Sequence, residues 1–598
     1  MGKYKNRKEV PIKYQWDLTE FFESDKKWEQ ELNRVKKLLP KIKKYKNNLN
    51  DPYKLEEYLN LDIDISNSIL DLYVYAYLSH DVDLEDSIYI EMKNKASSLS
   101  SEYELINAFA VPEILKLDEV SFKNAFKKNK NLLKFKAYLT DIYKEKKHTL
   151  SEGEEAIISS LTETYSSYSD LSSILLDLEH NYGKVEIDNE LITIATNNVR
   201  YLKKNNDPKI REEVSNKFNN VLKQYQVTAS SLLNYYVKNN INLAKIRKYK
   251  SPWHRKLDSL HLKQVIFDSL IGVSRNNSNI NKKYYKLAKK ALKLPVLYNY
   301  DLSLDWNKST DKYSIEDAQN LIKEALNILG DDYLGKLEKV FDNQYIDYCQ
   351  YKGKVSGGYS YATYRKNSRI LLSYNESVED IFTIIHEVGH NIHHQYVNDN
   401  NEEWYRHTPS IIAEVASLTN EILLSNYLYK NGKNKTEKLI GLENFIKTFK
   451  SNFFGAVMEG ELELKMYDHV QNGNSITADF LNNEADSLLS HYIGDSIEKS
   501  DYDKLMWITR SHYFMDFYLF SYAICISVAC IVAEKIINNE DDFILKYKKF
   551  LSCGSNLKPI EIFKTLGIDI TKKEIYEQAV KYFNSKLDLY EKLSEDGE

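Results

Sequence analysis

The chain has 598 residues, 42% of them hydrophobic and 28% charged, with 82 basic residues against 87 acidic ones. This length exceeds one ordinary domain and supports a large buried core. The balanced charge gives no indication of nucleic-acid binding. The 4 cysteines form no CxxC pair, which excludes a disulfide framework and fits a reducing compartment. Only 9 prolines and 19 glycines interrupt the chain, so long helices are expected.

The first third of the chain has the pattern of a helical array. Residues 17–176 carry apolar side chains every three or four positions. Residues 184–194 instead alternate around Asp188 and Asn189, which predicts a short hairpin. The N-terminus is charged and lacks the apolar segment of a signal peptide, so we expect a cytoplasmic protein. We place a boundary near residue 200, after an N-terminal helical lobe over residues 1–200.

A second extended region precedes residue 377. Segments 343–353, 355–364 and 369–374 are rich in Tyr, Ile, Leu and Ser, which predicts a small β-sheet.

Two glycines begin the middle segment of that sheet. Gly357 and Gly358 would leave an edge strand starting at Tyr359 free to pair with an extended peptide. A plain glycine turn explains the pair equally well.

The segment IFTIIHEVGHNIHH places His386, Glu387 and His390 in an HExxH pattern. Ser377 is a suitable N-cap and apolar residues follow at helical spacing, so we expect a helix that points both histidines in one direction. Two such histidines can hold a zinc ion, whose bound water would give a proton to Glu387 for transfer to a leaving amine. The pattern predicts a zinc centre for amide hydrolysis.

The next predicted helix offers a third ligand. Glu414 lies on an otherwise apolar face and needs a partner. Gly389 on the first helix suits close approach of another backbone, and small residues around Glu414 would permit it. Glu421 shares the face of Glu414 and could accept a hydrogen bond from a ligand histidine. The small residues are Ala413, Ala416 and Ser417.

Other side chains compete for the third position. His393 and His394 lie about 10 to 12 Å along the helix from the first histidine, too far to share its ion. Asp399, Glu402 and Glu403 are further carboxylates in a polar segment. Spacing alone does not decide between these and Glu414.

HEVGH followed by AEVAS resembles oligoendopeptidase F, of the thimet-oligopeptidase-like zinc metallopeptidases. The segments VPIKYQWDLTEFF, YKGKVSGGYS and FLSCGSNLKPIEIFKTLGIDI are similar to that family as well. The resemblance implies that His386, His390 and Glu414 hold one zinc ion per chain, with Glu387 as the base and Glu421 behind the ligands.

The same resemblance implies a fold and a substrate class. The fold is mainly α: a two-lobed helical body around a deep channel, with a small β-sheet beside the HExxH helix. The channel would admit oligopeptides and exclude folded proteins. Residues 201–598 would form the catalytic domain.

The family also has a downstream His and Tyr cluster, which the segment HYFMDFYLFSYAI resembles. His512, Tyr518 and Tyr522 are retained, and would donate hydrogen bonds to the oxyanion of the reaction. Met515 and Phe520 stand where the family has tyrosines, so which tyrosine completes the site stays open. Without the resemblance, an aromatic stripe of this kind is more often core.

The most apolar segment, residues 517–533, is shorter than the ~20 residues of a membrane span and contains two serines, which favours a buried core helix. We therefore expect a zinc metalloendopeptidase acting on short oligopeptides, without nucleic-acid or membrane partners. The alternatives are a zinc exopeptidase and a non-catalytic helical peptide-binding protein with a vestigial HExxH.

Overall fold

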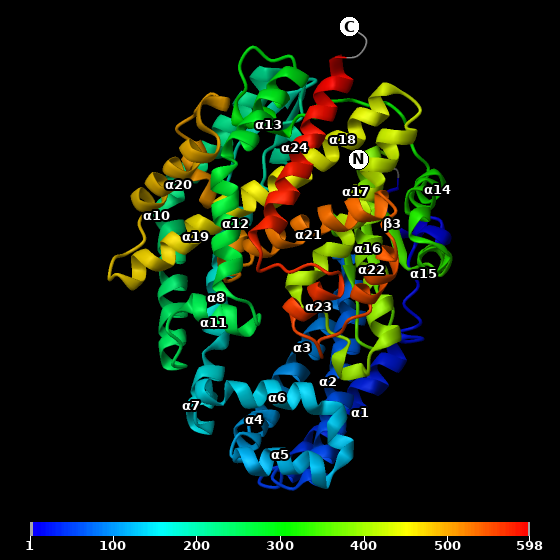
Figure 1. Cartoon of the computed structure of the whole chain (residues 1–598), viewed down its shortest axis with the longest axis vertical. Coiled ribbons are helices and arrows are strands. Elements are labelled where there is room, and N and C mark those ends of the chain that lie inside the picture. Colours follow the sequence, from blue (N-terminus) through cyan, green and yellow to red (C-terminus); the bar gives the residue numbers. More distant parts are fainter. Residues whose placement is uncertain (1–3, 596–598) are drawn as a thin grey trace. The chain divides into compact units, whose positions relative to one another are not determined.

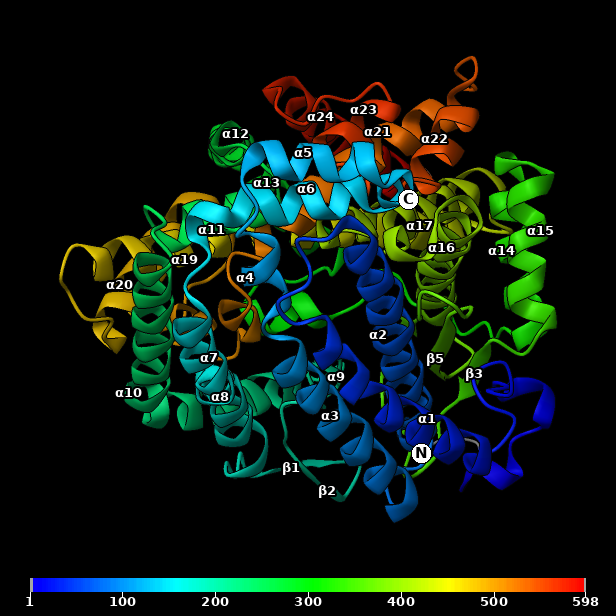
Figure 2. The same ribbon diagram turned by 90° about the horizontal axis from the view of Figure 1, so that it is seen from below.

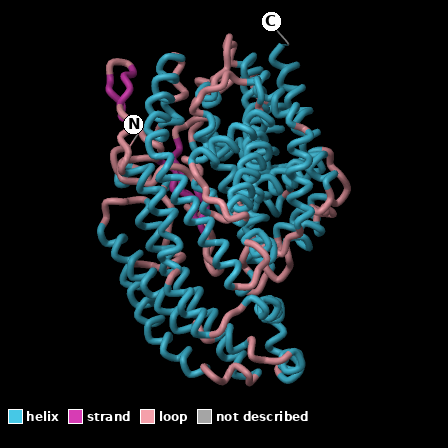
Figure 3. The backbone as a smooth tube through the Cα atoms, turned by 90° about the vertical axis from the view of Figure 1, so that its left-hand side faces the viewer, coloured by secondary structure: helices cyan, strands magenta, loops and turns pink. Residues whose placement is uncertain are grey.

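The computed structural model describes residues 4–595, and the chain is 70% helical with 4% in strands (Figure 3). The predicted mainly α fold is confirmed. The chain forms two compact units, each built from three separate stretches. Unit 1 runs to Ser159 and adds Asp311–Leu424 and Lys535–Gly567, whereas unit 2 comprises Ser160–Thr310, Ser425–Glu534 and the residues from Ile568 onward.

These units do not coincide with the division proposed at residue 200. The chain passes between them near residues 159, 310, 424, 534 and 567. Helices α17 (Ser410–Asn431) and α21 (Leu519–Ile537) continue through two of these points without a break. A crossing inside a regular helix leaves no Pro, Gly or Ser-rich linker to mark it. The predicted channel between the lobes stays a prediction.

Unit 1 begins with three long helices that pack side by side (Figure 2): α1 (Asp25–Ile42), α2 (Pro52–Asp81) and α3 (Ser87–Asn107). The indole of Trp28 is fully buried between them and donates to the carbonyl of Leu72 at 2.8 Å. The shorter helices that follow are α4 (Ala110–Ile114), α5 (Glu119–Lys128), α6 (Lys136–Lys144) and α7 (Glu152–Ser160).

The second stretch of unit 1 contains the predicted sheet. Strand β5 (Arg369–Tyr374) lies in the middle, parallel to β3 (Ile346–Cys349) and antiparallel to β4 (Tyr359–Tyr361). Strand β4 is therefore at an edge of this three-stranded sheet. The remaining helices of unit 1 are α14 (Ile315–Leu326), α15 (Asp331–Asp342), α16 (Val378–Asn400), α22 (Phe543–Leu551) and α23 (Pro559–Thr565).

Helix α16 carries the HExxH pattern and begins as predicted. The Ser377 side chain accepts from the Asp380 N–H while the Asp380 carboxylate accepts from the Ser377 N–H, a reciprocal capping box. Helix α17 lies against it (Figure 1), in close contact at Gly389. A Cβ atom at position 389 would lie 2.7 Å from the Cα of Ser417 and 3.0 Å from the carbonyl oxygen of Ala416. The two backbones meet because this residue has no side chain.

Unit 2 is also helical. The predicted hairpin forms its only sheet within the described residues, with β1 (Lys184–Ile187) antiparallel to β2 (Glu190–Thr193) and left-handed Asp188 and Asn189 at the turn. Its helices are α8 (Thr162–Ser173), α9 (Val199–Leu202), α10 (Pro208–Ile246), α11 (Pro252–Ser259), α12 (Gln264–Asn276), α13 (Ser278–Ala291), α18 (Lys435–Phe449), α19 (Ala456–Gln471), α20 (Ala478–Tyr492) and α24 (Lys573–Glu595).

Helix α21 contains the most apolar segment. It is long and apolar enough to cross a membrane, yet 78% of its most apolar 18-residue window is buried inside the protein. Burial of this extent is expected of a core helix in a folded domain, as the sequence predicted.

Gly389→Ala tests the close approach of α16 and α17. The added methyl group meets backbone atoms, which cannot rotate away, so the helices must separate. We expect the free energy of unfolding to fall by about 1 to 3 kcal/mol, measured by urea denaturation. Gly335→Ala in α15 is the matched control, because its Cβ would have no neighbour within 4 Å. Equal stability of the two variants would contradict the close-approach argument.

Candidate metal centre and active site

Three side chains from α16 and α17 converge on one point. The Nε2 atom of His386 lies 3.3 Å from Oε2 of Glu414, and Nε2 of His390 lies 3.4 Å from the same oxygen. One ligand atom from each of the three residues lies within 4.8 Å of the others. Two imidazole nitrogens and a carboxylate oxygen are the donor set of many catalytic zinc sites, which leave a further position open.

A second set of hydrogen bonds fixes the orientation of these three side chains. Glu421 Oε1 lies 2.6 Å from Nδ1 of His386, the nitrogen turned away from Glu414. The hydroxyl of Ser417 donates to Glu414 Oε2 at 2.9 Å. Buried Asn420 donates to the carbonyl of Ile385 at 3.3 Å and so ties α17 to α16. These bonds restrict both the rotamers and the helix spacing.

The electrostatics of this cluster favour a cation. Burial opposes ionisation of Glu414, yet its hydrogen bonds with His386 and His390 hold its pKa far below the ordinary value. Burial likewise disfavours the charged form of His386, but its bonds with Glu414 and Glu421 raise the pKa of the imidazole well above normal. The carboxylates therefore create a negative electrostatic potential around the histidine nitrogens. A divalent cation suits such a cluster.

Glu387 lies beside the ligands on α16 and is only 7% exposed. Burial raises the pKa of its carboxyl group, although the charges of His386 and His390 act in the opposite direction. A carboxylate with a raised pKa accepts a proton more readily than one in water. Its position and basicity suit the role of a general base.

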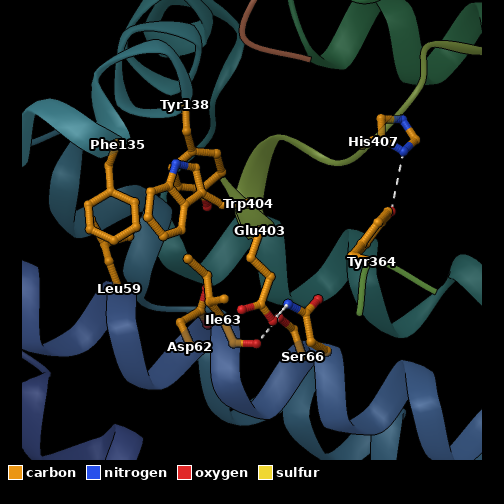
Figure 4. Close-up of a pocket in the computed structure, with 11 residues that line it drawn as sticks. Leu59, Asp62, Ile63, Ser66, Phe135, Tyr138, Tyr364, Glu403, Trp404 and His407 are labelled. Atoms are coloured by element: carbon orange, nitrogen blue, oxygen red, sulfur yellow. Dashed lines mark hydrogen bonds between the residues drawn. The ribbon is translucent and has the colours of Figure 1, made fainter. Parts of the chain in front are cut away.

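Two of the three competing carboxylates are engaged elsewhere. Asp399 pairs with Lys336 at 2.5 Å. Glu403 pairs with Arg365 and accepts from Asn67, with its carboxylate turned toward α2 (Figure 4). Neither belongs to the cluster of three ligands.

Figure 4 shows the cavity of about 260 Å³ that Glu403 lines, enclosed by aromatic rings from α6 and the α16–α17 connection. Tyr364 on its rim hydrogen-bonds to Nδ1 of His407 at 3.2 Å. No local sequence pattern indicates this cavity, because its walls come from segments that are distant in the chain: Leu59, Ile63, Phe135, Tyr138 and Trp404.

His393 and His394 are not ligands in this geometry. Nε2 of His394 lies 2.8 Å from the carbonyl oxygen of Thr363. His393 is 3% exposed and stacks on Phe550. Burial lowers the pKa of His393 to about 3 and of His394 to about 4, so both are neutral at physiological pH.

The glycine pair shows features of both predicted explanations. Gly357 has a φ of 100°, as in a turn. Its N–H donates to Ser373 Oγ of strand β5 at 2.9 Å. A Cβ at Gly358 would lie 2.9 Å from the Thr383 side chain of α16. Tyr359 then opens the edge strand β4 opposite Leu371. The glycines thus bring the edge strand onto the HExxH helix.

His512, Tyr518 and Tyr522 form a cluster of their own in unit 2. His512 belongs to the short helix η13 (Ser511–Phe514), Tyr518 immediately precedes α21, and Tyr522 lies in the first turn of α21. Nε2 of His512 lies 3.2 Å from the Tyr522 hydroxyl, and the two tyrosine rings meet edge to face with centroids 5.1 Å apart. Burial, and then the charge of Arg510, lowers the pKa of His512. The lowered pKa favours the neutral form of the His512 ring. Together with the two tyrosines it forms a group of hydrogen-bonding side chains.

The supporting residues Ser417 and Asn420 were not predicted. Ser417 was interpreted only as a small residue, and Asn420 had no pattern beyond being polar on an apolar face. A polar residue predicted to be buried is a signal that could have found Asn420.

Comparison with known proteins identifies the family. Residues 201–582 match the model of peptidase family M3, and residues 113–179 match that of oligopeptidase F. Oligopeptidase PepF of Bacillus subtilis is 30% identical over 98% of this chain and 88% of its own length. The plasmid oligoendopeptidase F of Lactococcus lactis subsp. cremoris is 29% identical over 99% of both.

A solved structure shows the same fold. The crystal structure of oligoendopeptidase-F from Enterococcus faecium superposes with a TM-score of 0.75 at 23% identity, covering 96% of this chain and 100% of that one. With the M3 model matching most of the chain and a 30% identical relative matching nearly all of it, the chain belongs to peptidase family M3, among the metallo-oligopeptidases of the oligoendopeptidase F type.

Proposed function

We propose that this metallo-oligopeptidase is a zinc-dependent endopeptidase that hydrolyses internal bonds of short oligopeptides in the cytoplasm. The observation that carries the proposal is the convergence of two histidines and one glutamate beside the buried carboxyl of Glu387. The four cysteines are free thiols, which suits a reducing compartment. Relatives named for endopeptidase activity support the choice over an exopeptidase.

In this proposal His386, His390 and Glu414 hold the zinc ion, and Glu421 orients His386 through Nδ1. When bound, zinc supplies Lewis acidity, which polarises the amide carbonyl and makes water a better proton donor. Glu387 accepts one proton from the attacking water and delivers it to the nitrogen of the departing amine. The raised pKa of this carboxyl suits both transfers.

The substrate backbone would bind along β4. Its outer edge pairs with no other strand in residues 4–595, so an extended peptide can add there through main-chain hydrogen bonds. Gly357 and Gly358 leave the start of this strand without side chains, and Tyr359 begins the pairing region. Main-chain recognition would accept many sequences, as an oligopeptidase requires.

The last part of the proposal concerns hydrogen-bond donors for the oxyanion of the reaction. Tyr518 and Tyr522, with His512 in contact, would stabilise the negative charge that develops on the substrate carbonyl oxygen. The role requires this cluster to reach the scissile bond. The vestigial-site alternative predicts peptide binding without turnover, so activity measurements separate it from the proposal.

The first test of the function uses an N-acetylated, C-amidated peptide. We expect internal cleavage, lost with a chelator and restored by zinc. Glu387→Gln should keep the metal but lower kcat/KM by about 10² to 10⁴-fold, because the amide cannot accept a proton. Products are identified by mass spectrometry. If blocked peptides stay intact while free ones are trimmed, the protein is an exopeptidase.

The ligand assignment predicts different effects for two glutamates. Glu414→Ala should lose metal and activity together, because it removes a ligand atom. Glu421→Ala should weaken metal affinity by about 10 to 100-fold, because it only frees the His386 ring. Metal content and affinity are measured by competition with a chromophoric chelator. Equal zinc content in Glu414→Ala and the wild type would reject the ligand assignment.

The oxyanion role predicts slow variants that still bind metal. At least one of Tyr518→Phe and Tyr522→Phe, together with His512→Ala, should lower kcat by about 10² to 10³-fold with little change in KM. Tyr513→Phe is the matched control, because its buried hydroxyl has no hydrogen-bond partner. If both Tyr518→Phe and Tyr522→Phe keep the wild-type rate, the tyrosines are packing residues.

A further inference from the structure

The chain makes an unusual bend immediately before Tyr518. Asp516 has a φ of 48° and Phe517 a φ of 60°, so two consecutive residues with side chains adopt the left-handed conformation. This region is unfavourable for L-residues, and a bulky residue such as Phe is seldom found there. Neither position is occupied by glycine. Such a bend persists only where surrounding contacts hold it in place.

The Asp516 side chain is held by donors from two long helices. Its Oδ1 atom accepts from Tyr236 of α10 at 2.7 Å and from Asn240 of α10 at 2.7 Å. Tyr467 of α19 donates to the same oxygen at 3.3 Å. The guanidinium of Arg255 lies 3.8 Å from Oδ2. These contacts fix the carboxylate of a residue whose backbone is strained.

The backbone of Phe517 has its own anchor. Its N–H donates to Oε1 of Glu463 at 2.8 Å, and the Glu463 side chain is fully buried on α19. The Phe517 ring lies against Trp253 and Tyr467, with centroids 4.8 and 4.6 Å away. Burial raises the pKa of Glu463 well above its ordinary value, which favours the protonated carboxyl group. Gln is therefore its closest replacement.

The bend lies between the two parts of the hydrogen-bonding cluster. Helix η13, with His512, ends at Phe514, whereas Tyr518 directly precedes α21, which begins at Leu519 and contains Tyr522. The dihedral angles of Asp516 and Phe517 therefore set the direction in which α21 leaves η13. They determine how the hydroxyls of Tyr518 and Tyr522 lie relative to His512.

We propose that Asp516 and Glu463 are positioning residues, which hold the left-handed bend and thereby aim Tyr518 and Tyr522. The inference rests on the proposed oxyanion role of these tyrosines. A bend with a purely structural role would be better served by glycine, which adopts this conformation without strain. Here two carboxyl groups are buried or partly buried to hold it.

Asp516→Gly is the decisive variant. Glycine tolerates the left-handed conformation but removes the anchor, so the protein should fold while the bend becomes free to move. We expect kcat to fall by about 10 to 100-fold, because small misplacements of catalytic groups have effects of this size. KM and metal content should change little, whereas the melting temperature should fall, because three donors lose their shared acceptor. Asp516→Asn should recover most of the rate, since Asn tolerates the conformation and keeps an acceptor oxygen.

The role of Glu463 is tested with one conservative and one disruptive substitution, and with a control substitution at Glu461. Glu463→Gln keeps an oxygen for the Phe517 N–H and should stay near the wild-type kcat, whereas Glu463→Leu should be slow. Glu461→Gln is the matched control: Glu461 is buried on the same helix but bonds to Arg275 and Tyr492. It should lower the melting temperature without changing kcat. A kcat loss as large in Glu461→Gln as in Glu463→Leu would overturn the inference.

A double-mutant cycle shows whether Asp516 acts through the tyrosines. Asp516→Gly is combined with whichever of Tyr518→Phe and Tyr522→Phe is slow. If the inference holds, the combined loss in kcat is smaller than the product of the single losses. Multiplicative losses, or a wild-type rate in Asp516→Gly, would overturn the positioning inference alone. If both tyrosine variants keep the wild-type rate, the oxyanion role fails and the inference fails with it.

Discussion

The metal centre depends on the backbone contact between α16 and α17 at Gly389. The three candidate ligands, His386, His390 and Glu414, come from two helices, so they can share one ion only where these helices lie close together. Gly389 allows this approach, and Ser417, which lies at the contact, also donates to Glu414 three residues earlier on α17. The site is therefore specified first by helix packing and only then by ligand identity. A glycine within an HExxH segment has a structural meaning that the ligand pattern alone does not convey.

Buried carboxylates have two different uses in this protein. Beside α16 they create a negative electrostatic potential around the imidazole nitrogens, which favours binding of a cation. On α19 they fix the positions of other segments instead. Glu459 pairs with Arg510, Glu461 with Arg275, and Glu463 accepts from a backbone N–H. Glu459 and Glu463 are four residues apart and share one face of α19, where they hold Arg510 and Phe517, whereas Glu461 projects from another face to Arg275.

Local sequence patterns predicted the parts of the fold that local physics determines. The Ser377 cap, the HExxH helix and the hairpin turn at Asp188 and Asn189 follow from capping, helical spacing and turn chemistry. Glu414 was predicted as a candidate because a charge on an apolar face needs a partner. Its competitor Asp399 forms an ion pair with Lys336, a residue distant in sequence, which no local pattern indicates.

Other features left no local signal. Asp516 adopts the left-handed conformation more readily than most residues, but nothing in the sequence predicts it for Phe517, whose conformation is held by Glu463 and Trp253. The three-part composition of each unit was also missed, because its crossings lie within helices such as α17.

The composition of unit 1 has a consequence for synthesis on the ribosome. Its last stretch, Lys535–Gly567, packs directly behind the metal-bearing segments: Phe550 stacks on His393, and Asn401 donates to the carbonyl of Ser552 at 2.8 Å. A nascent chain that has already exposed every metal ligand still lacks this support. The contacts at His393 and Asn401 therefore form only after residue 552 has been synthesised, when translation is nearly complete.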